Sequence, residues 1–410
     1  MKKEIRRSWG IPRRAAAAGL ALLSLLLGGC GAAPGTLPGS MQSSGEEVAA
    51  EMQTPEETGL DPTEAGTAGE GLTFQEQIPL EHAKLFRIDA YEGGFLMVTV
   101  DGGTRLLSVP EGAEVPQGLE DDIIVLQQPA DELYLAASAA ADMLDTIGCL
   151  DAVRYSATDE QNWHIEGIRS AMERGEILYA GKYSTPDYEM LTAGGCRLAV
   201  ENMMIMHTPE VIDKLGELGI PVIIDHASYE SDPLGRLEWV KFYGVLTGHF
   251  EEAVAAYEAQ AAQTHGLEET GKTVAFFYLR QDGSVVVRRS DDYVPEMIRL
   301  AGGAYIPEDV TGESHLSTGS MQFEAFYEAA LDADYLVYNG TTSGAIHSIA
   351  ELLEKSGLMA DFTAVKEGHV YAVSQDMYQN TMSLGTVVAD LHRMMTDAAD
   401  EEMIYLEHLY

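Results

Sequence analysis

The sequence predicts an α/β protein with two Rossmann-like lobes, each built on a mostly parallel sheet, joined by one long helix. Short apolar segments alternate with helical patterns from about residue 133 to residue 227. The pattern then stays helical to about residue 265, and a second alternation runs from residue 273 towards the C-terminus. Apolar strands that alternate with helices are typical of parallel sheets covered on both faces.

Residues 1–29 are predicted to be a lipoprotein signal peptide. A basic head precedes the apolar run AAAAGLALLSLLL, which is shorter than the roughly 20 residues that a membrane-spanning helix requires. Two glycines and Cys30 follow it directly, as in a bacterial lipobox, so we expect lipid attachment at Cys30. The alternative is an ordinary signal peptide with an incidental cysteine.

Residues 30–76 are rich in Gly, Ser, Thr, Pro and Glu and poor in large apolar residues, which predicts a disordered tether. The whole chain has 25 basic and 66 acidic residues, for a net charge of −41. Such a charge repels phosphate backbones and argues against nucleic acid as a partner. Cys149 and Cys196 could form a disulfide in an exported protein or stay separate thiols, and the sequence leaves this open.

The folded part divides into three predicted segments. The N-terminal lobe covers residues 77–230, and its short extra strands at 81–127 either extend the first sheet or form a small appendage. The inter-lobe helix covers residues 231–268, where apolar positions recur at spacings of three and four. The C-terminal lobe covers residues 269–410 and starts with a hairpin around Gln281-Asp282-Gly283.

The segment GLEETGKT, Gly266–Thr273, fits the pattern of a phosphate-binding P-loop. A P-loop follows a strand and opens a helix, whereas this segment follows a helical pattern and leads into the apolar strand TVAFFYL. We therefore reject nucleotide binding here. The common short signatures of hydrolases, metalloproteases and dinucleotide-binding proteins are also missing, so we expect a protein that is not an enzyme.

Several local segments match one known family. They are ILYAGKYSTPDYEML with CRLAVE, then LGELGIPVII, LEWVKFYGVLTGHFEEA, and MIRLAGGAYIPED with LSTGSMQFEAFYEAALDADYLVYN. With the order of lipobox, tether, lobe, helix and lobe, they resemble the helix-hinged class of bacterial solute-binding lipoproteins, which serve ABC importers for ferric siderophores, haem and cobalamin. The similarity runs from about residue 125 to the C-terminus. CRL and DAD stand where the family often has a Pro-Asp pair.

The resemblance implies a rigid two-lobed receptor, lipid-anchored on the extracytoplasmic face of the bacterial membrane, with its ligand in a groove between the lobes. The ligand would be an iron–siderophore or a similar iron chelate, delivered by a monomer to a permease dimer and its ATPase. Alternatives are a haem or cobamide receptor of the same class, a two-lobed lipoprotein enzyme, and a sensory or scaffold lipoprotein. No cofactor is implied, and no compact ligand cluster for a bare metal ion is visible.

Loop residues after predicted strands are the candidate ligand contacts, because open α/β sheets bind ligands there. They are Ser138, Trp163, Tyr183, His207, Arg288, Arg289, Tyr293, Asn339 and Tyr378, and the same loops also offer His164, Met204, Met321 and Gln379. Arg288 and Arg289 point to opposite sides of a strand, so at most one should reach the ligand while the other pairs with Asp291 or Asp292. The resemblance also implies that Glu189 and Glu324 dock the permease.

Overall fold

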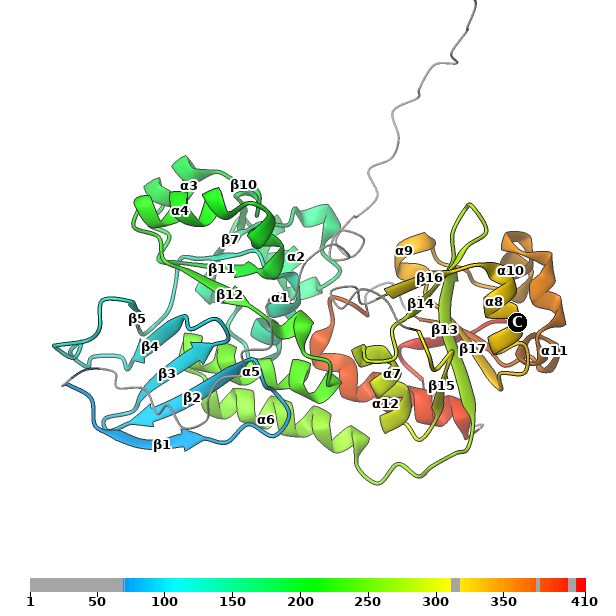
Figure 1. The fold of residues 1–410 in the computed structure, drawn as a ribbon. Helices are drawn as coiled ribbons and strands as arrows, with labels where there is room; N and C mark the ends of the chain where they lie inside the picture. Colours follow the sequence, from blue (N-terminus) through cyan, green and yellow to red (C-terminus); the bar gives the residue numbers. More distant parts are fainter. Residues whose placement is uncertain (1–68, 70, 311–317, 374–376, 397–402) are drawn as a thin grey trace, which may run out of the picture. The chain divides into compact units, whose positions relative to one another are not determined.

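The computed structural model describes residues 69, 71–310, 318–373, 377–396 and 403–410 (Figure 1). The predicted signal peptide, Cys30 and nearly all of the predicted tether lie outside these ranges. The first strand, β1, begins at Phe74, so the tether boundary at residue 76 was placed too far along the chain. Within the described ranges, every helix is too short or too polar to cross a bilayer.

The extra strands near the N-terminus form a sheet of their own, which settles the alternative that the sequence left open. Strands β1 to β4 are antiparallel neighbours in chain order, and β5 pairs with β4 in parallel. The five strands are Phe74–Ile78 (β1), Phe86–Tyr91 (β2), Phe95–Val100 (β3), Arg105–Val109 (β4) and Ile123–Gln127 (β5). On one face, the ring of Phe86 packs 4.8 Å from Trp239 and 6.0 Å from Phe242.

The first α/β sheet is fully parallel, with the strand order β12-β11-β6-β7-β8. Its strands are Leu133–Leu135 (β6), Val153–Ser156 (β7), Leu178–Tyr179 (β8), Leu198–Asn202 (β11) and Val222–Asp225 (β12). Its helices are Ser138–Thr146 (α1), Glu166–Glu173 (α2), Tyr188–Ala193 (α3) and Pro209–Glu217 (α4), and the short strands Gly181–Lys182 (β9) and Thr185–Pro186 (β10) form a small hairpin. Hydrophobic clusters cover both faces, since Leu198 and Val200 face one cluster and Ala199 faces another.

The second α/β sheet has the order β16-β14-β13-β17-β18-β19, with β15 also paired to β13. Its strands are Thr273–Leu279 (β13), Val285–Arg288 (β14), Ala304–Ile306 (β15), Thr318–Met321 (β16), Tyr335–Tyr338 (β17), Val370–Val373 (β18) and Leu406–His408 (β19). Its helices are Tyr293–Leu300 (α7), Phe323–Ala330 (α8), Gly340–Ser343 (α9), Ile349–Lys355 (α10), Thr363–Glu367 (α11) and Leu384–Met395 (α12). The expected hairpin is the antiparallel pair β13–β14. The P-loop-like segment leads directly into β13, so a strand follows it as expected, and not the helix that a P-loop opens.

The prediction of one long inter-lobe helix is wrong. The segment forms two helices, α5 (Pro233–Thr247) and α6 (Phe250–Ala261), separated by Gly248 in the left-handed conformation with φ 75°. The ammonium of Lys241 lies 4.3 Å from the ring centroid of Tyr257, although one continuous helix would separate these residues by about 24 Å. The two helices therefore fold back on each other (Figure 1).

A glycine at each of two positions makes this helical hairpin possible. Gly248 ends α5 in a conformation that other residues adopt only with strain. A Cβ atom on Gly244 would lie 2.5 Å from the Cβ atom of Ala253, so only glycine allows the helices to approach this closely. The apolar spacing continues across the turn, which is why periodicity alone predicted a single helix.

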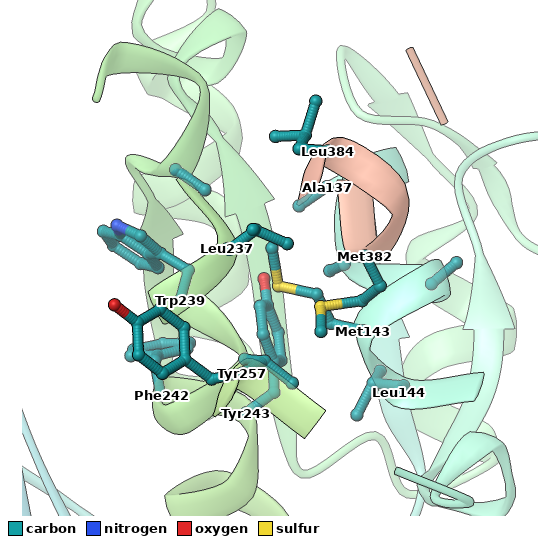
Figure 2. Packing of buried hydrophobic residues seen from close by; sticks show 14 of the residues in the cluster. Ala137, Met143, Leu144, Leu237, Trp239, Phe242, Tyr243, Tyr257, Met382 and Leu384 are labelled. Atoms are coloured by element: carbon teal, nitrogen blue, oxygen red, sulfur yellow. The ribbon is translucent and has the colours of Figure 1, made fainter. Parts of the chain in front are cut away.

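One hydrophobic cluster runs through the helical hairpin and includes residues of all three sheets. Figure 2 shows α5 and α6 side chains facing Met143 and Leu144 of α1, with Met382 and Leu384 beside them. Cys149 belongs to this cluster and Cys196 to a different one, and both are buried free thiols. The structure thus decides the open question against a disulfide between them.

A carboxylate clamp joins the N-terminal five-stranded sheet to α5. Glu238 accepts the backbone N–H groups of residues 81, 82 and 83 at 2.8–3.0 Å, and Glu230 accepts those of residues 84 and 85 at 2.9 Å. Glu238 is fully buried and also receives the ammonium of Lys241 at 2.7 Å. We refer to Glu230, Glu238 and the segment 81–85 as the carboxylate clamp.

Replacing Glu238 with Ala should lower the free energy of unfolding by about 3–5 kcal/mol, because it leaves a buried ammonium and three backbone donors without their carboxylate. Urea denaturation followed by circular dichroism measures the change. Glu258→Ala, at an exposed position of α6, is the matched control and should change stability by less than about 0.5 kcal/mol. Equal effects of the two substitutions would contradict the role of the clamp.

Candidate functional site

Four of the predicted contact residues meet in the second lobe: Arg288, Tyr293, Asn339 and Tyr378. The hydroxyl of Tyr378 accepts hydrogen bonds from the guanidinium of Arg288 and, at 2.9 Å, from the side-chain amide of Asn339. The guanidinium carbon of Arg288 lies 5.2 Å from the ring centroid of Tyr378 and 5.8 Å from that of Tyr293. We call these four residues the arginine cluster.

The arginine cluster lies where an open α/β sheet usually binds ligands. Asn339 follows the carboxyl end of β17, and Tyr378 belongs to the segment after β18. Arg288 ends β14 and is held there by the Tyr305 hydroxyl, which donates to its carbonyl oxygen at 2.8 Å. Loops that are far apart in the sequence therefore bring these groups together.

The two donors of the cluster are buried and held in orientation. Arg288 and Asn339 are each 2 % exposed. The Oδ1 atom of Asn339 accepts from the N–H of Thr341 at 3.2 Å and from its hydroxyl at 2.6 Å, which directs the amide nitrogen towards Tyr378. Arg288 Nη1 lies 3.8 Å from an oxygen of Asp292. Both donors are thus arranged to meet one oxygen atom.

Arg289 has the structural role that the sequence allowed for one member of the pair. Its guanidinium donates to both carboxylate oxygens of Asp291, at 2.9 and 2.6 Å. Tyr293 is 4 % exposed, and the guanidinium of Arg236 covers its ring at 3.6 Å from the centroid. In this conformation Tyr293 therefore supports the cluster from within the core and does not present a surface to a ligand.

The first-lobe candidates are not brought together in the same way. Ser138 is exposed at the start of α1, Tyr183 is partly buried between β9 and β10, and His207 is exposed at the end of the turn 203–207. Among the described residues, no hydrogen bond or ring contact joins any of them to another candidate. They remain predictions.

The expectation that Trp163 contacts ligand conflicts with its burial. Trp163 is 2 % exposed, and its indole N–H lies 3.2 Å from both the Ser156 hydroxyl and the Thr158 carbonyl oxygen. Large loop aromatics suit a bulky ligand, but this ring fills the core of its own lobe instead. Its neighbours in the chain, Asn162 and His164, are exposed.

Gln379 had been named only as a loop residue, and the structure gives it a specific role. Its side-chain amide donates to the carbonyl oxygen of Asn162 at 2.9 Å and accepts from the N–H of His164 at 2.8 Å. Three residues further on, the N–H of Met382 donates to Asp142 of α1 at 2.6 Å. Residues 377–383, which we call the strap, therefore join the second lobe to the first.

Glu189 and Glu324 occupy equivalent positions in their lobes. Each is exposed and is the second residue of a helix, α3 or α8. No described contact restrains either carboxylate. Both side chains can thus meet a partner surface, as the docking prediction requires.

A buried acid without a hydrogen-bond partner is absent from the candidates that the sequence indicated. Glu201 of β11 is fully buried, and neither of its carboxylate oxygens has a hydrogen-bond partner in the part of the chain that the structure describes. Burial raises the pKa of Glu201 from 4.5 to about 8. A charged residue inside the apolar strand CRLAVEN was the available signal.

Two cavities lie away from the arginine cluster. One, of about 460 Å³, is lined by residues before β6, β7 and β8, such as Glu132, Asp151 and Glu176, and so lies at the amino ends of these strands. The other, of about 560 Å³, lies beside β19. Ligands of open α/β sheets bind at the opposite, carboxyl ends, so the first cavity is not retained as the main site. The second is lined by Ala372 and Val373 at the end of β18, but none of the predicted contact residues lines it. In the described ranges, no three His, Cys, Asp or Glu side chains are grouped as metal ligands would be.

Comparisons with known proteins agree with this architecture. No family model matches the chain. An uncharacterized lipoprotein of Methanocaldococcus jannaschii is 26 % identical over 326 residues, which is 74 % of this chain and 72 % of the relative. A second uncharacterized lipoprotein of that organism is 22 % identical over 319 residues, which is 73 % of this chain and 78 % of the relative.

Solved structures identify the fold. The petrobactin-binding protein YclQ of Bacillus subtilis superposes with a TM-score of 0.53 and 14 % identity, covering 78 % of this chain and 99 % of its own. The periplasmic haem-binding protein HutB of Vibrio cholerae superposes with a TM-score of 0.52 and 16 % identity, covering 63 % of this chain and 97 % of its own. The chain has the two-lobed fold of the class III periplasmic solute-binding proteins, so the predicted fold class is confirmed apart from the single inter-lobe helix.

Glu201→Gln should remove a pH dependence of stability. The folded protein keeps a proton on Glu201 that the unfolded chain releases above pH 4.5, so the contribution of this group to stability falls as pH rises towards 8. The loss is on the order of 3 to 5 kcal/mol. Urea denaturation from pH 5 to pH 9 should show wild-type stability falling relative to Glu201→Gln. The exposed control Glu210→Gln should follow the wild type, and a pH-independent difference for Glu201→Gln would contradict the assignment.

Proposed function

We propose that this protein is the extracytoplasmic substrate-binding component of an ABC importer, and that it captures an iron–siderophore or a similar iron chelate. The observation that supports this most is the arginine cluster at the carboxyl ends of second-lobe strands, in a fold shared with petrobactin- and haem-binding proteins. A buried guanidinium with an adjacent amide donor suits the oxygen-rich anionic groups of such chelates.

The proposed location follows from the N-terminus and the relatives. Both curated relatives are named lipoproteins, and the structural neighbour HutB is a periplasmic haem-binding protein. Attachment through a lipidated Cys30 would hold the receptor on the extracytoplasmic face of the membrane, beside a permease dimer and its ATPase. These neighbours are binding proteins and not enzymes, which favours capture over turnover.

Haem is the second candidate ligand. His207 is exposed in the turn that follows β11, at the carboxyl edge of the first α/β sheet. An imidazole there could coordinate a haem iron. One structural neighbour is a haem-binding protein. Loss of haem binding in His207→Ala, with siderophore binding absent in the wild type, would favour this candidate.

Ligand binding should depend on Arg288. We expect isothermal titration of the full-length protein in detergent, against ferric siderophores, haem, cobalamin, Fe³⁺ and Zn²⁺, to show saturable binding of one iron chelate. Arg288→Gln should weaken it by about tenfold or more, because it removes a charge-assisted hydrogen bond worth about 1.5–3 kcal/mol. Arg299→Gln, which removes an exposed guanidinium paired with Glu296, is the control.

Thermal unfolding of each variant shows whether it is folded. Unchanged affinity in both Arg288→Gln and Arg289→Gln would show that the ligand role of this pair is wrong. Binding of a bare ion alone would point to a metal receptor, and no binding at all would return the enzyme and scaffold alternatives.

The double substitution Glu189→Ala/Glu324→Ala should abolish uptake of the chelate by cells while ligand affinity stays unchanged. Removing one exposed carboxylate from each lobe would prevent docking on the permease without altering the arginine cluster. Uptake of ⁵⁵Fe-labelled chelate and titration of the purified protein measure the two properties. Glu210→Ala/Glu328→Ala, which removes exposed helix glutamates of the same lobes, should leave uptake unchanged, and a loss of ligand affinity in the docking variant would refute the proposed role.

A further inference from the structure

The strap has two sets of contacts that begin at adjacent residues. The hydroxyl of Tyr378 accepts from Arg288 and Asn339 in the second lobe. The side chain of Gln379 holds the backbone at Asn162 and His164 in the first lobe. Because the two residues are neighbours in the chain, a backbone movement that takes Tyr378 from its partners also moves Gln379.

A ligand oxygen could occupy the position of the Tyr378 hydroxyl between Arg288 and Asn339. Arg288 and Asn339 are buried and held in orientation by Asp292 and Thr341, so both donors keep their direction whichever oxygen they meet. Tyr378, in contrast, is partly exposed and lies on the loop after β18. It is thus the least buried of the three hydrogen-bonded side chains, although its ring packs against the largest hydrophobic cluster.

Resting on the proposed function, we propose that the Tyr378 hydroxyl occupies an anion site formed by Arg288 and Asn339 when no ligand is bound. An anionic ligand oxygen displaces this hydroxyl and releases Gln379 from the first lobe, while Met382 stays bonded to Asp142. A carboxylate or catecholate oxygen carries charge, so it accepts stronger hydrogen bonds from a guanidinium than a neutral phenol does. The ligand class is therefore an iron chelate with an outward-facing anionic oxygen. A neutral chelate gains nothing at this site.

Displacement of Tyr378 also affects the contacts that Gln379 makes with the first lobe. A ligand that binds only the form in which Tyr378 is displaced shifts the population towards that form. Gln379 then leaves Asn162 and His164, and the direct link between the lobes through this residue is lost. Since coupling is reciprocal, a variant in which Gln379 no longer holds the first lobe should bind the anion more tightly at Arg288 and Asn339.

The backbone N–H of His164 is a direct reporter of the strap, because it donates to Gln379. Hydrogen–deuterium exchange of the full-length protein in detergent, followed by mass spectrometry of peptides covering residues 159–165, measures its protection. Tyr378→Phe should raise exchange at His164 about tenfold, because it removes the hydroxyl that accepts from Arg288 and Asn339 and so holds the strap in place. Tyr327→Phe is the matched control: it removes the hydroxyl of a tyrosine on α8, which donates to Asp361, and it should leave exchange unchanged. Unchanged exchange in Tyr378→Phe overturns the proposal.

The binding experiment uses three probes: ferric citrate, the ferric complex of 2,3-dihydroxybenzoate, and the neutral hydroxamate chelate ferrichrome. Tyr378→Phe and Gln379→Ala should each lower the Kd of the anionic probes by about threefold to tenfold relative to wild type. The Kd of ferrichrome should not change. Saturating anionic probe should also raise exchange at His164 in the wild type.

The outcomes separate this inference from the proposed function. Tighter anion binding with increased exchange at His164 supports both. Weaker binding of the anionic probes in Tyr378→Phe means that Tyr378 is itself a ligand contact, which overturns the displacement while leaving the receptor function intact. If no chelate binds any variant, the proposed function and the anion site fail together, whatever the exchange experiment shows for the strap.

Discussion

Two buried carboxylates determine how the N-terminal part of this protein is assembled. Glu230 and Glu238 accept five consecutive backbone N–H groups of the segment 81–85. These hydrogen bonds link the N-terminal five-stranded sheet to the start of α5. Lys241 neutralises Glu238 within the same helix, so the charge is buried with a full set of partners. Without these acceptors the segment would leave unsatisfied donors beside the core.

The position of α5 has consequences further along the chain. Because α5 and α6 fold back on each other at Gly248, the largest hydrophobic cluster includes residues of both lobes. Met382 and Leu384, next to the strap, pack into that cluster (Figure 2). The other end of the strap is also held by apolar burial, since Met377 lies in that cluster and Tyr378 packs against it. Gln379 lies between the two ends and holds the first lobe through hydrogen bonds.

Much of the fold could be predicted from local patterns. Strand–helix alternation correctly indicated two α/β sheets, of which the first is fully parallel and the second is mixed, and a strand follows GLEETGKT as expected. The helix break failed because apolar residues keep a helical spacing on both sides of Gly248, so periodicity contains no sign of the reversal. Trp163 failed for a related reason: loop position does not reveal whether a ring turns outwards or into its own core.

The sequence by itself determined which segments alternate and where the polar loops follow strands, because apolar spacing and backbone geometry set these features over a few residues. Only the tertiary structure decided that Arg288, Asn339 and Tyr378 share one oxygen position, that Gln379 reaches the first lobe, and that Glu201 lies in an apolar core. These contacts join residues tens to hundreds of positions apart. The distances between these residues in the folded protein depend on how whole sheets pack, and local sequence patterns do not determine that packing.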